Sequence, residues 1–418
     1  MPSPSRGCIM YETDPSPIVG VAAGLLSDRF GETLRLTVDG VLSRNDSNVV
    51  IRCRVQNGCS GVPTSFIIKA PNDRAAGRCP RQATGSAACE LMNDWAASLF
   101  LERTGSTAPL APLLYCGDRD RRLLVLEDLG EGDAPNTAAV LHSGDADLAH
   151  RRLVEHVSLI GRLHALTLGR RDEYLEIRNR LGAELAPKPV YTDPWSSARI
   201  EPIPNGELEQ AVTNYRSCAA GVGVTPPPGI ETEIWGAAKI IEEHAGPLLA
   251  FCKGDQDGAD DYIWQASKPR LIDFGSSGYR HALIEGLPGF LTWGCVMRIP
   301  QGVVQSMESA YRSELGRAWP SSPVDFDRAM VWASGRWHIL HVVHRLPEAL
   351  AEDRQRGPTT LRQQVIAWLD AFADLSERFN ELPALGASAR ALVQRLRRIW
   401  PSDVSQLPYY PAFRALRA

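Results

Sequence analysis

The sequence lacks the features that mark several large classes of protein. No apolar stretch approaches the ~20 residues needed to span a bilayer, and the N-terminal residues MPSPSRGCIMYETDPSPIVG contain no apolar core of a signal peptide. Basic residues form no concentrated run, and the formal net charge is −4. We therefore expect a cytoplasmic protein that acts on neither a membrane nor a nucleic acid.

The cysteines indicate no particular kind of site, and lysine is rare. The nine cysteines are widely spaced and include no C-x-x-C pair, which argues against a disulfide framework and a zinc site. Lysine occurs at only five positions, whereas lysine and arginine together number 45. Two of the five direct attention to chemistry, because Lys69 ends an apolar run and Lys253 lies beside an acidic loop.

The first part of the chain has the pattern of short strands around one helix. The runs TLRLTVDGVL, VVIRCRV and TSFIIKA predict strands, SAACELMNDWAASLFLERTG predicts a helix, and APLLYCGD and RRLLVLEDLG predict a hairpin. The predicted order over residues 1–130 is β-β-β-α-β-β. We interpret this part as a small, β-rich domain.

From residue 131 onward the pattern is mainly helical. LAHRRLVEHVSLIGRLHALTLG and IETEIWGAAKIIEEHAGPLLAF predict helices, and DYIWQ and PRLIDFG predict short strands. Further helices are expected over 281–298, 301–318, 323–352, 358–382 and 387–399. Residues 131–418 therefore form the larger, helical domain, which contains the acidic segment 251–275, and the fold class is α+β.

Five residues occur in the order that phosphoryl transfer requires. The reaction needs a cation on the nucleotide phosphates, a carboxylate that orients it, a carboxylate that receives the acceptor's proton, and oxygen ligands for Mg²⁺. Lys69 ends a strand, and Glu90, near the start of the next helix, could pair with it. Asp255 and Asp260 lie in one loop, and Asp273 follows a strand. Backbone groups of 126–129 could bind an adenine edge.

The acidic loop KGDQDGADDYIW also invites comparison with a calcium loop. A calcium loop of this length has its glycine at the sixth position, which would place Lys253 first and Trp264 last. Calcium requires oxygen ligands at both ends, so this alternative fails.

Seven segments in order resemble the aminoglycoside phosphotransferase and choline kinase family, which has the two-lobed fold of protein kinases. They span residues 42–280 and read LSRNDSNVV, FIIKA, ACELMNDWAASLFLERTG, LLVLEDLGEG, LIGRLHALT, KGDQDGAD and LIDFGSSG. The resemblance implies ATP and Mg²⁺ as cofactors and a hydroxylated small molecule as acceptor. The remaining C-terminal residues match only as a generic helical lobe.

The resemblance also implies a role for each matching residue. Ser47 and Asn48 would approach the phosphates from a turn without the usual glycines, and the chain from Glu127 to Leu129 would be the adenine hinge. Lys69 would contact the α- and β-phosphates and be held by Glu90. Asp255 would be the catalytic carboxylate, and Asp260 and Asp273 would bind magnesium.

Two positions depart from the family's catalytic loop and leave two functions open. Lys253 replaces the usual His, and Asp260 replaces the usual Asn, which adds a negative charge that Lys253 could offset. The first function is ATP-dependent transfer of the γ-phosphate to a hydroxyl of a small molecule bound between 170–245 and the C-terminal helices. The alternative is a nucleotide-binding pseudokinase without transfer. A protein kinase is disfavoured because no A-P-E element follows IDFG.

Histidines and tryptophans outside this order have ordinary alternatives. His164, in an apolar helical pattern, fits a buried, hydrogen-bonded histidine better than a catalytic one. His338, His341 and His344 recur every three residues, which allows a metal site, a substrate-lining role or packing. Tryptophans such as Trp337 could line a pocket or simply fill the core.

Overall fold

The structure is a computed structural model, and it falls into two compact units. Unit 1 comprises Met1–Glu102, Pro112–Gly130 and Ile177–Val190, and unit 2 comprises Arg103–Ala111, Glu131–Glu176 and Tyr191–Ala418. The domain boundary expected at residue 130 stays a prediction. The residues described are 15–44, 48–57, 60–71, 86–106, 108–132, 137–182, 203–243, 248–254, 262–265, 268–290, 296–316, 318, 326–401 and 406–417.

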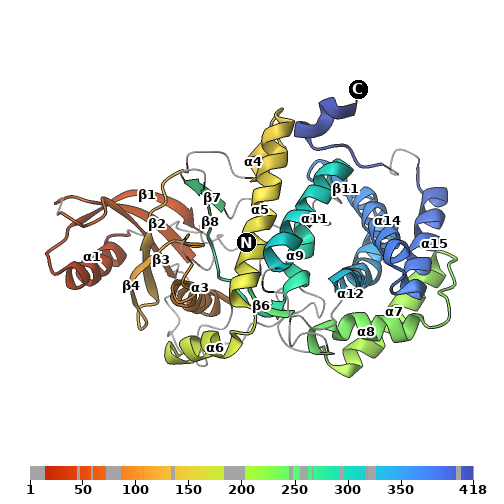
Figure 1. Ribbon diagram of the computed structural model, residues 1–418, viewed down its shortest axis with the longest axis horizontal. Coiled ribbons are helices and arrows are strands. Elements are labelled where there is room, and N and C mark those ends of the chain that lie inside the picture. The colour runs from red at the N-terminus through yellow and green to blue at the C-terminus, as the bar shows by residue number, and fades with distance from the viewer. Residues whose placement is uncertain are drawn as a thin grey trace, which may run out of the picture. The chain divides into compact units, whose positions relative to one another are not determined.

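Unit 1 is built on a five-stranded antiparallel sheet in the order β1-β2-β3-β5-β4. Figure 1 labels β1, β2, β3 and β4 of this sheet. Its strands are β1 (Leu36–Arg44), β2 (Asn48–Val55), β3 (Ser65–Pro71), β4 (Leu114–Asp118) and β5 (Leu123–Glu127). The helix α3 (Ser86–Glu102) follows β3 in the chain. The predicted order β-β-β-α-β-β is confirmed from β1 onward, but not for the residues before it.

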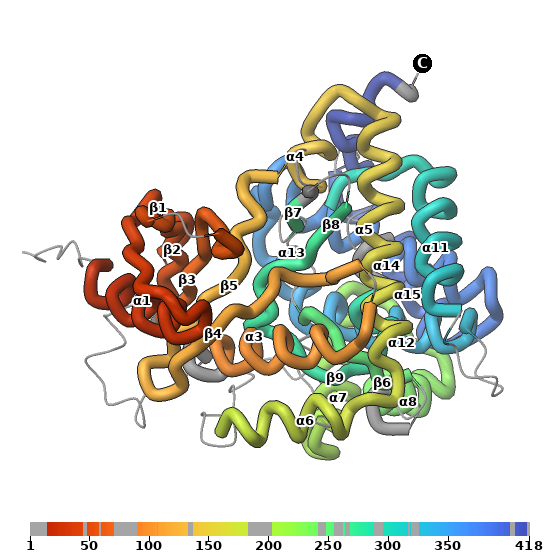
Figure 2. The backbone as a smooth tube through the Cα atoms, turned by 60° about the vertical axis from the view of Figure 1, so that its left-hand side comes forward, coloured from red at the N-terminus to blue at the C-terminus, as the bar shows by residue number. Residues whose placement is uncertain are grey.

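A helix that the sequence analysis did not predict precedes the sheet. It is α1 (Ser16–Phe30), which has a proline in its first turn and ends at Gly31 in the left-handed conformation, φ 71°. Val19, Ala22 and Leu26 pack with Phe66 and other buried residues of one sheet face. Figure 2 shows α1 beside the strands of unit 1, which it contacts. The α1 helix therefore closes the core on that face.

The opposite face of the sheet is covered by α3. Side chains alternate between faces along a strand, so Phe66 and Ile68 of β3 face α1 while Lys69 lies on the face of α3. Leu91, Met92 and Trp95 of α3 pack with Leu124 of β5, the residue that pairs with Lys69. A cation is thus placed on the sheet face beside a helix.

Unit 2 is mainly helical, as predicted. Figure 1 shows the long α5 (Ala146–Thr167) beside α11 (Gln301–Gly316), and the two helices are in contact. The other helical elements are α4 (Thr137–Leu141), α6 (Arg171–Arg180, which continues into unit 1), α7 (Asn205–Gly221), α8 (Ile230–Glu243), α9 (Ala282–Phe290), α12 (Phe326–Leu340), the π-helix η3 (His341–Arg345), α13 (Leu346–Ala351), α14 (Leu361–Phe379), α15 (Pro383–Ile399) and the 3₁₀ helix η5 (Pro411–Arg417). The α+β class is confirmed.

Three two-stranded ladders interrupt these helices. They are β6 (Leu249–Cys252) with β9 (Gly278–His281), β7 (Tyr262–Gln265) with β8 (Lys268–Leu271), and β10 (Gln355–Arg356) with β11 (Thr359–Thr360). The helix predicted to run through LLAF was wrong at its end, because that segment forms β6. A short apolar run fits a buried strand as well as a helix, and only the pairing with β9 decides. Within the described residues, no helix is both long and apolar enough to cross a bilayer.

Candidate active site

Lys69 of β3 forms a buried ion pair with Asp94 of α3. The ammonium Nζ contacts Asp94 Oδ2, and both side chains are nearly sealed from solvent. Sequence spacing had suggested Glu90 as the partner, one helical turn earlier. The observed partner is Asp94, because that turn of α3 faces Lys69. Ion pairs buried to this degree need close geometry to offset desolvation, so the pair fixes the position of the ammonium.

Glu90 instead lies near the start of β2. Its Oε2 accepts a long hydrogen bond, 3.5 Å, from Nδ2 of the buried Asn48. Asn48 and Lys69 therefore lie on neighbouring strands and contact carboxylates of one helix. Ser47 lies outside the described residues, and its expected phosphate contact stays a prediction, as do those of Asn48 and Glu90.

The predicted hinge is held in place on both sides. Glu127 ends β5, and its Oε2 accepts a hydrogen bond from the backbone N–H of Leu113 at 3.1 Å. Asp128 accepts from Nε of Arg52 on β2 at 3.2 Å and from the N–H of Gly130 at 2.9 Å. Leu129 is buried. These hydrogen bonds hold the segment in place. Its contact with a nucleotide stays a prediction.

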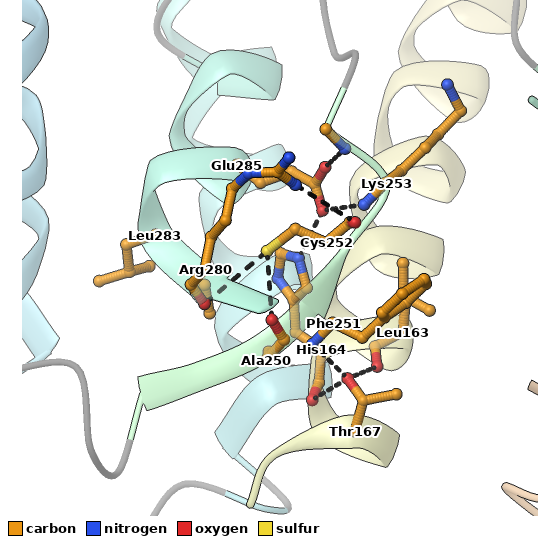
Figure 3. Close-up of polar contacts among 12 residues, drawn as sticks. Leu163, His164, Thr167, Ala250, Phe251, Cys252, Lys253, Arg280, Leu283 and Glu285 are labelled. Carbon is orange, nitrogen blue, oxygen red and sulfur yellow. Dashed lines mark hydrogen bonds and ion pairs between the residues drawn. The ribbon is translucent and has the colours of Figure 1, made fainter. Parts of the chain in front are cut away.

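In unit 2, a single carboxylate holds the turn that precedes Asp255. Glu285 of α9 accepts the N–H of Lys253 at 3.0 Å on Oε2 and the N–H of Gly254 at 2.5 Å on Oε1 (Figure 3). Lys253, which stands where the resemblance leads one to expect a histidine, is completely buried. The two bonds fix the backbone immediately before the predicted catalytic carboxylate.

Glu285 is in turn held by His164 of α5. His164 Nε2 lies 2.8 Å from Glu285 Oε2, and its Nδ1 lies 2.9 Å from the hydroxyl of Tyr311 on α11. All three side chains are buried. The interpretation of His164 as a buried, hydrogen-bonded residue is confirmed. It supports the loop through Glu285.

Electrostatics favour the ionised form of Glu285. Burial by itself raises its pKa, but the hydrogen bond and charge of His164, the N–H of Gly254 and the charge of Arg280 outweigh burial and lower the pKa below its usual value. The neighbouring Cys252 thiol has a raised pKa because it is buried and lies close to Glu285. The site therefore contains a buried carboxylate anion and a neutral thiol.

His164, Cys252 and Glu285 could hold a metal ion by distance alone. One possible ligand atom from each lies within 4.8 Å of the others. The carboxylate oxygens, however, already accept the two backbone N–H groups and His164. These hydrogen bonds account for the arrangement, and Figure 3 shows them converging on the carboxylate.

The turn before Asp255 also packs against the segment after Asp273. Gly254 has φ 92°, and a Cβ added there would lie 2.0 Å from the carbonyl oxygen of Ser276. Arg280 of β9 donates to that same oxygen at 2.5 Å. The ring of Phe251 stacks on that of Phe274, with centroids 6.2 Å apart. Residues 251–254, which precede Asp255, therefore pack against residues 274–280, which follow Asp273.

Asp273 has an uncommon backbone conformation. It is exposed, follows β8 and has φ 60°, a left-handed conformation that is uncommon for a residue other than glycine. Such strain persists where the surroundings impose it, and it clusters at ligand sites. An exposed carboxylate at a strand end fits the chemistry of an Mg²⁺ ligand. Asp255 and Asp260 lie outside the described residues.

Sequence reasoning missed Asp94, Glu285 and Tyr311. Asp94 lies one helical turn from Glu90, the residue expected to pair with Lys69. The sequence does not determine which turn of α3 faces Lys69. Glu285 had a signal, because it is the only charged residue in the apolar stretch ALIEGLPGFL. Tyr311 is an ordinary apolar-face residue of α11, and its hydroxyl gives no signal in sequence.

No model of a protein family and no curated protein matches this chain. Solved structures do. An aminoglycoside phosphotransferase from Alicyclobacillus acidocaldarius is 10% identical, with a TM-score of 0.42, and the match covers 85% of this chain and 93% of that one. APH(2")-IIa, solved in a ternary complex with streptomycin and ATP, is 11% identical to this chain, with a TM-score of 0.41. The match covers 81% of this chain and 95% of that one. Choline kinase LicA from Streptococcus pneumoniae is 12% identical, with a TM-score of 0.37 and coverage of 90% and 99%. These proteins are of the family that the seven segments resemble.

Proposed function

We propose that this protein transfers the γ-phosphate of ATP to a hydroxyl of a small molecule. The observation that carries the proposal is the packing of residues 251–254 against residues 274–280, held by Glu285 and Arg280. It fixes the residues that directly precede Asp255 and directly follow Asp273 in the chain. Phosphoryl transfer depends on this kind of positioning more than on covalent chemistry by the protein.

In the proposed reaction, Asp255 accepts the proton of the acceptor hydroxyl. The oxygen then attacks the γ-phosphorus, the bond from that phosphorus to the β–γ bridging oxygen breaks, and ADP leaves with the electron pair. Lys69, held by Asp94, carries positive charge for the nucleotide phosphates. Asp273 and Asp260 would hold Mg²⁺, which supplies charge neutralisation on the phosphate oxygens.

The proposal is tested by incubating the full chain with Mg·ATP and separate panels of amino sugars, amino alcohols, macrolides and neutral sugars. Mass spectrometry would detect a product heavier than an acceptor by one phosphoryl group. The proposal expects such a product with wild type and its loss in Asp255→Asn. Binding of ATP without any phosphorylated product would favour the pseudokinase instead.

A further inference from the structure

Two tryptophans of unit 2 each bury an indole N–H that has no acceptor. They are Trp337 of α12 and Trp368 of α14, and within the described part of the chain neither Nε1 has a hydrogen-bond partner. A buried donor in a folded protein is nearly always paired, so each exception calls for an explanation. Trp332, also on α12, shows the ordinary case, because its Nε1 donates to Glu381 Oε2 at 3.0 Å.

The two unpaired donors belong to one aromatic cluster. The rings of Trp337 and Trp368 meet edge to face with centroids 6.1 Å apart. The imidazole of His341 stacks on Trp368 at 4.6 Å with 21° between the planes. Trp368 is buried, whereas Trp337 and His341 are partly exposed. The cluster can therefore be approached from solvent on the side of Trp337 and His341.

His341 adds an acceptor to the two donors. Its Nδ1 lies 2.9 Å from the carbonyl oxygen of Trp337, and a carbonyl can only accept, so Nδ1 carries the proton. Burial, together with the charges of Arg345 and Arg356, lowers the pKa of His341 to about 4. The ring is neutral near pH 7, and its Nε2 presents a lone pair. The cluster thus combines two N–H donors with one acceptor.

The cluster lies where the helix departs from regular geometry. His341 begins η3, a single π-helical turn from His341 to Arg345. Such turns hold one residue more than an α-helical turn and occur often at functional sites. Trp337 and His341 reach solvent at the edge of the cluster, but both Nε1 atoms are covered, so a ligand has to displace the local packing to reach them.

The positive charges near His341 disfavour cationic ligands. The charged groups acting on His341 are Arg345 and Arg356, and both are positive. The nearby carboxylate of Glu348 is already bound to Arg345 at 3.4 Å and to Arg354 at 2.5 Å. A cationic amine would be repelled here. A hydroxyl group, which both accepts and donates, matches the indole N–H groups and the Nε2 lone pair.

We propose that Trp337, Trp368 and His341 form a binding site for an uncharged, hydroxyl-bearing small molecule. The ligand's hydroxyl oxygens accept from the two indole N–H groups, and one hydroxyl donates to His341 Nε2. The flat aromatic faces pack against the carbon skeleton. This site concerns binding only, and it does not depend on phosphate transfer.

The test uses the full chain labelled with ¹⁵N at tryptophan, without nucleotide. Indole N–H signals are recorded during titration with myo-inositol and with glucose, and in parallel with choline and 2-deoxystreptamine. Phenylalanine substitutions assign the signals of Trp337 and Trp368. We expect both signals to move to lower field with at least one neutral polyol and to stay unmoved by the two amines.

Variants separate binding from packing. Trp368→Phe keeps an aromatic ring but removes the N–H, and should raise the dissociation constant of the polyol about tenfold. Trp332→Phe, which removes a paired indole N–H on α12, the helix of Trp337, should leave the dissociation constant within about twofold. The proposal is overturned if neither signal moves with either polyol, or if the amines move them equally. Asp255→Asn should bind the polyol like wild type, so failure of transfer and failure of this site are distinguishable.

Discussion

The backbone N–H of Gly254 donates to Glu285 Oε1 at 2.5 Å, across 31 residues of sequence. Together with the bond from the N–H of Lys253, this contact ties the turn before Asp255 to the first part of α9. The carboxylate is buried and ionised, so it is a strong and directional acceptor.

Replacing Glu285 with Gln should therefore misplace the loop. The amide offers one acceptor oxygen for two N–H groups and turns its NH₂ toward the other. Leaving one buried N–H unpaired costs about 1–3 kcal/mol in free energy of unfolding. We expect kcat to fall at least tenfold while the KM for ATP changes little. Glu285→Asp should restore part of kcat, and Glu173→Gln, which disturbs a partly exposed pair with Arg170, should change neither.

Gly254 should tolerate no side chain. A Cβ at this position meets the carbonyl oxygen of Ser276 at 2.0 Å in addition to the strain of φ 92°. Gly229 has a similar φ of 88° but nothing within 4 Å. Gly229→Ala should cost only about 1–2 kcal/mol of strain, whereas Gly254→Ala should cost more and abolish transfer. Equal losses of unfolding free energy in the two variants would show that the close approach to Ser276 is not real.

The partner of Lys69 can be identified by a double-mutant cycle. Breaking a buried pair by removing one charge typically costs 3–5 kcal/mol. Lys69→Met combined with Asp94→Asn should show a coupling free energy above ~1 kcal/mol, measured by chemical denaturation. The same cycle with Glu90→Gln should show little coupling. The reverse ranking would mean that Glu90, the partner expected from the sequence, holds the ammonium.

The difference between those two carboxylates shows what the sequence could and could not settle. The order of elements from β1 onward, the presence of Lys69 on a strand and the position of Asp273 after a strand followed from alternating apolar residues and turn signals. Lys69 was expected at the end of its strand, but β3 continues to Pro71 and pairs Lys69 with Leu124 of β5. Which turn of α3 faces Lys69 depends on the packing of Trp95 and Leu91 against the sheet, which no local pattern encodes. The same limit hid Glu285, since its partners lie 31 and 121 residues away.

Two other elements illustrate different limits. The α1 helix begins with a proline in its first turn and ends at a glycine, so both of its ends are marked in the sequence. The β6 strand is four residues long and apolar throughout, so its pattern cannot be distinguished from the end of a buried helix. Only its pairing with β9 defines it as a strand.

Stability should fall in mildly acidic solution because of His338. It is fully buried, and burial together with the charge of His341 lowers its pKa to about 3. The unfolded chain, with an ordinary value of 6.5, binds the proton first. The stabilisation is therefore complete above pH 6.5 and declines as pH falls toward 3, by up to about 1.4 kcal/mol per pH unit. His338→Gln should reduce this slope in denaturation curves, and part of the slope should remain because the pKa of His341 is also lowered, to about 4. A slope unchanged from wild type would contradict this prediction.

The central claim is that Asp255 receives the proton in phosphate transfer to a small-molecule hydroxyl. The most direct measurement is single-turnover transfer from Mg·ATP to an identified acceptor, comparing wild type with Asp255→Asn. We predict a rate lower by 10²–10⁴-fold in the variant, with ATP binding unchanged. A variant that transfers phosphate at the wild-type rate, or a wild type that binds ATP and never phosphorylates an acceptor, would contradict the claim.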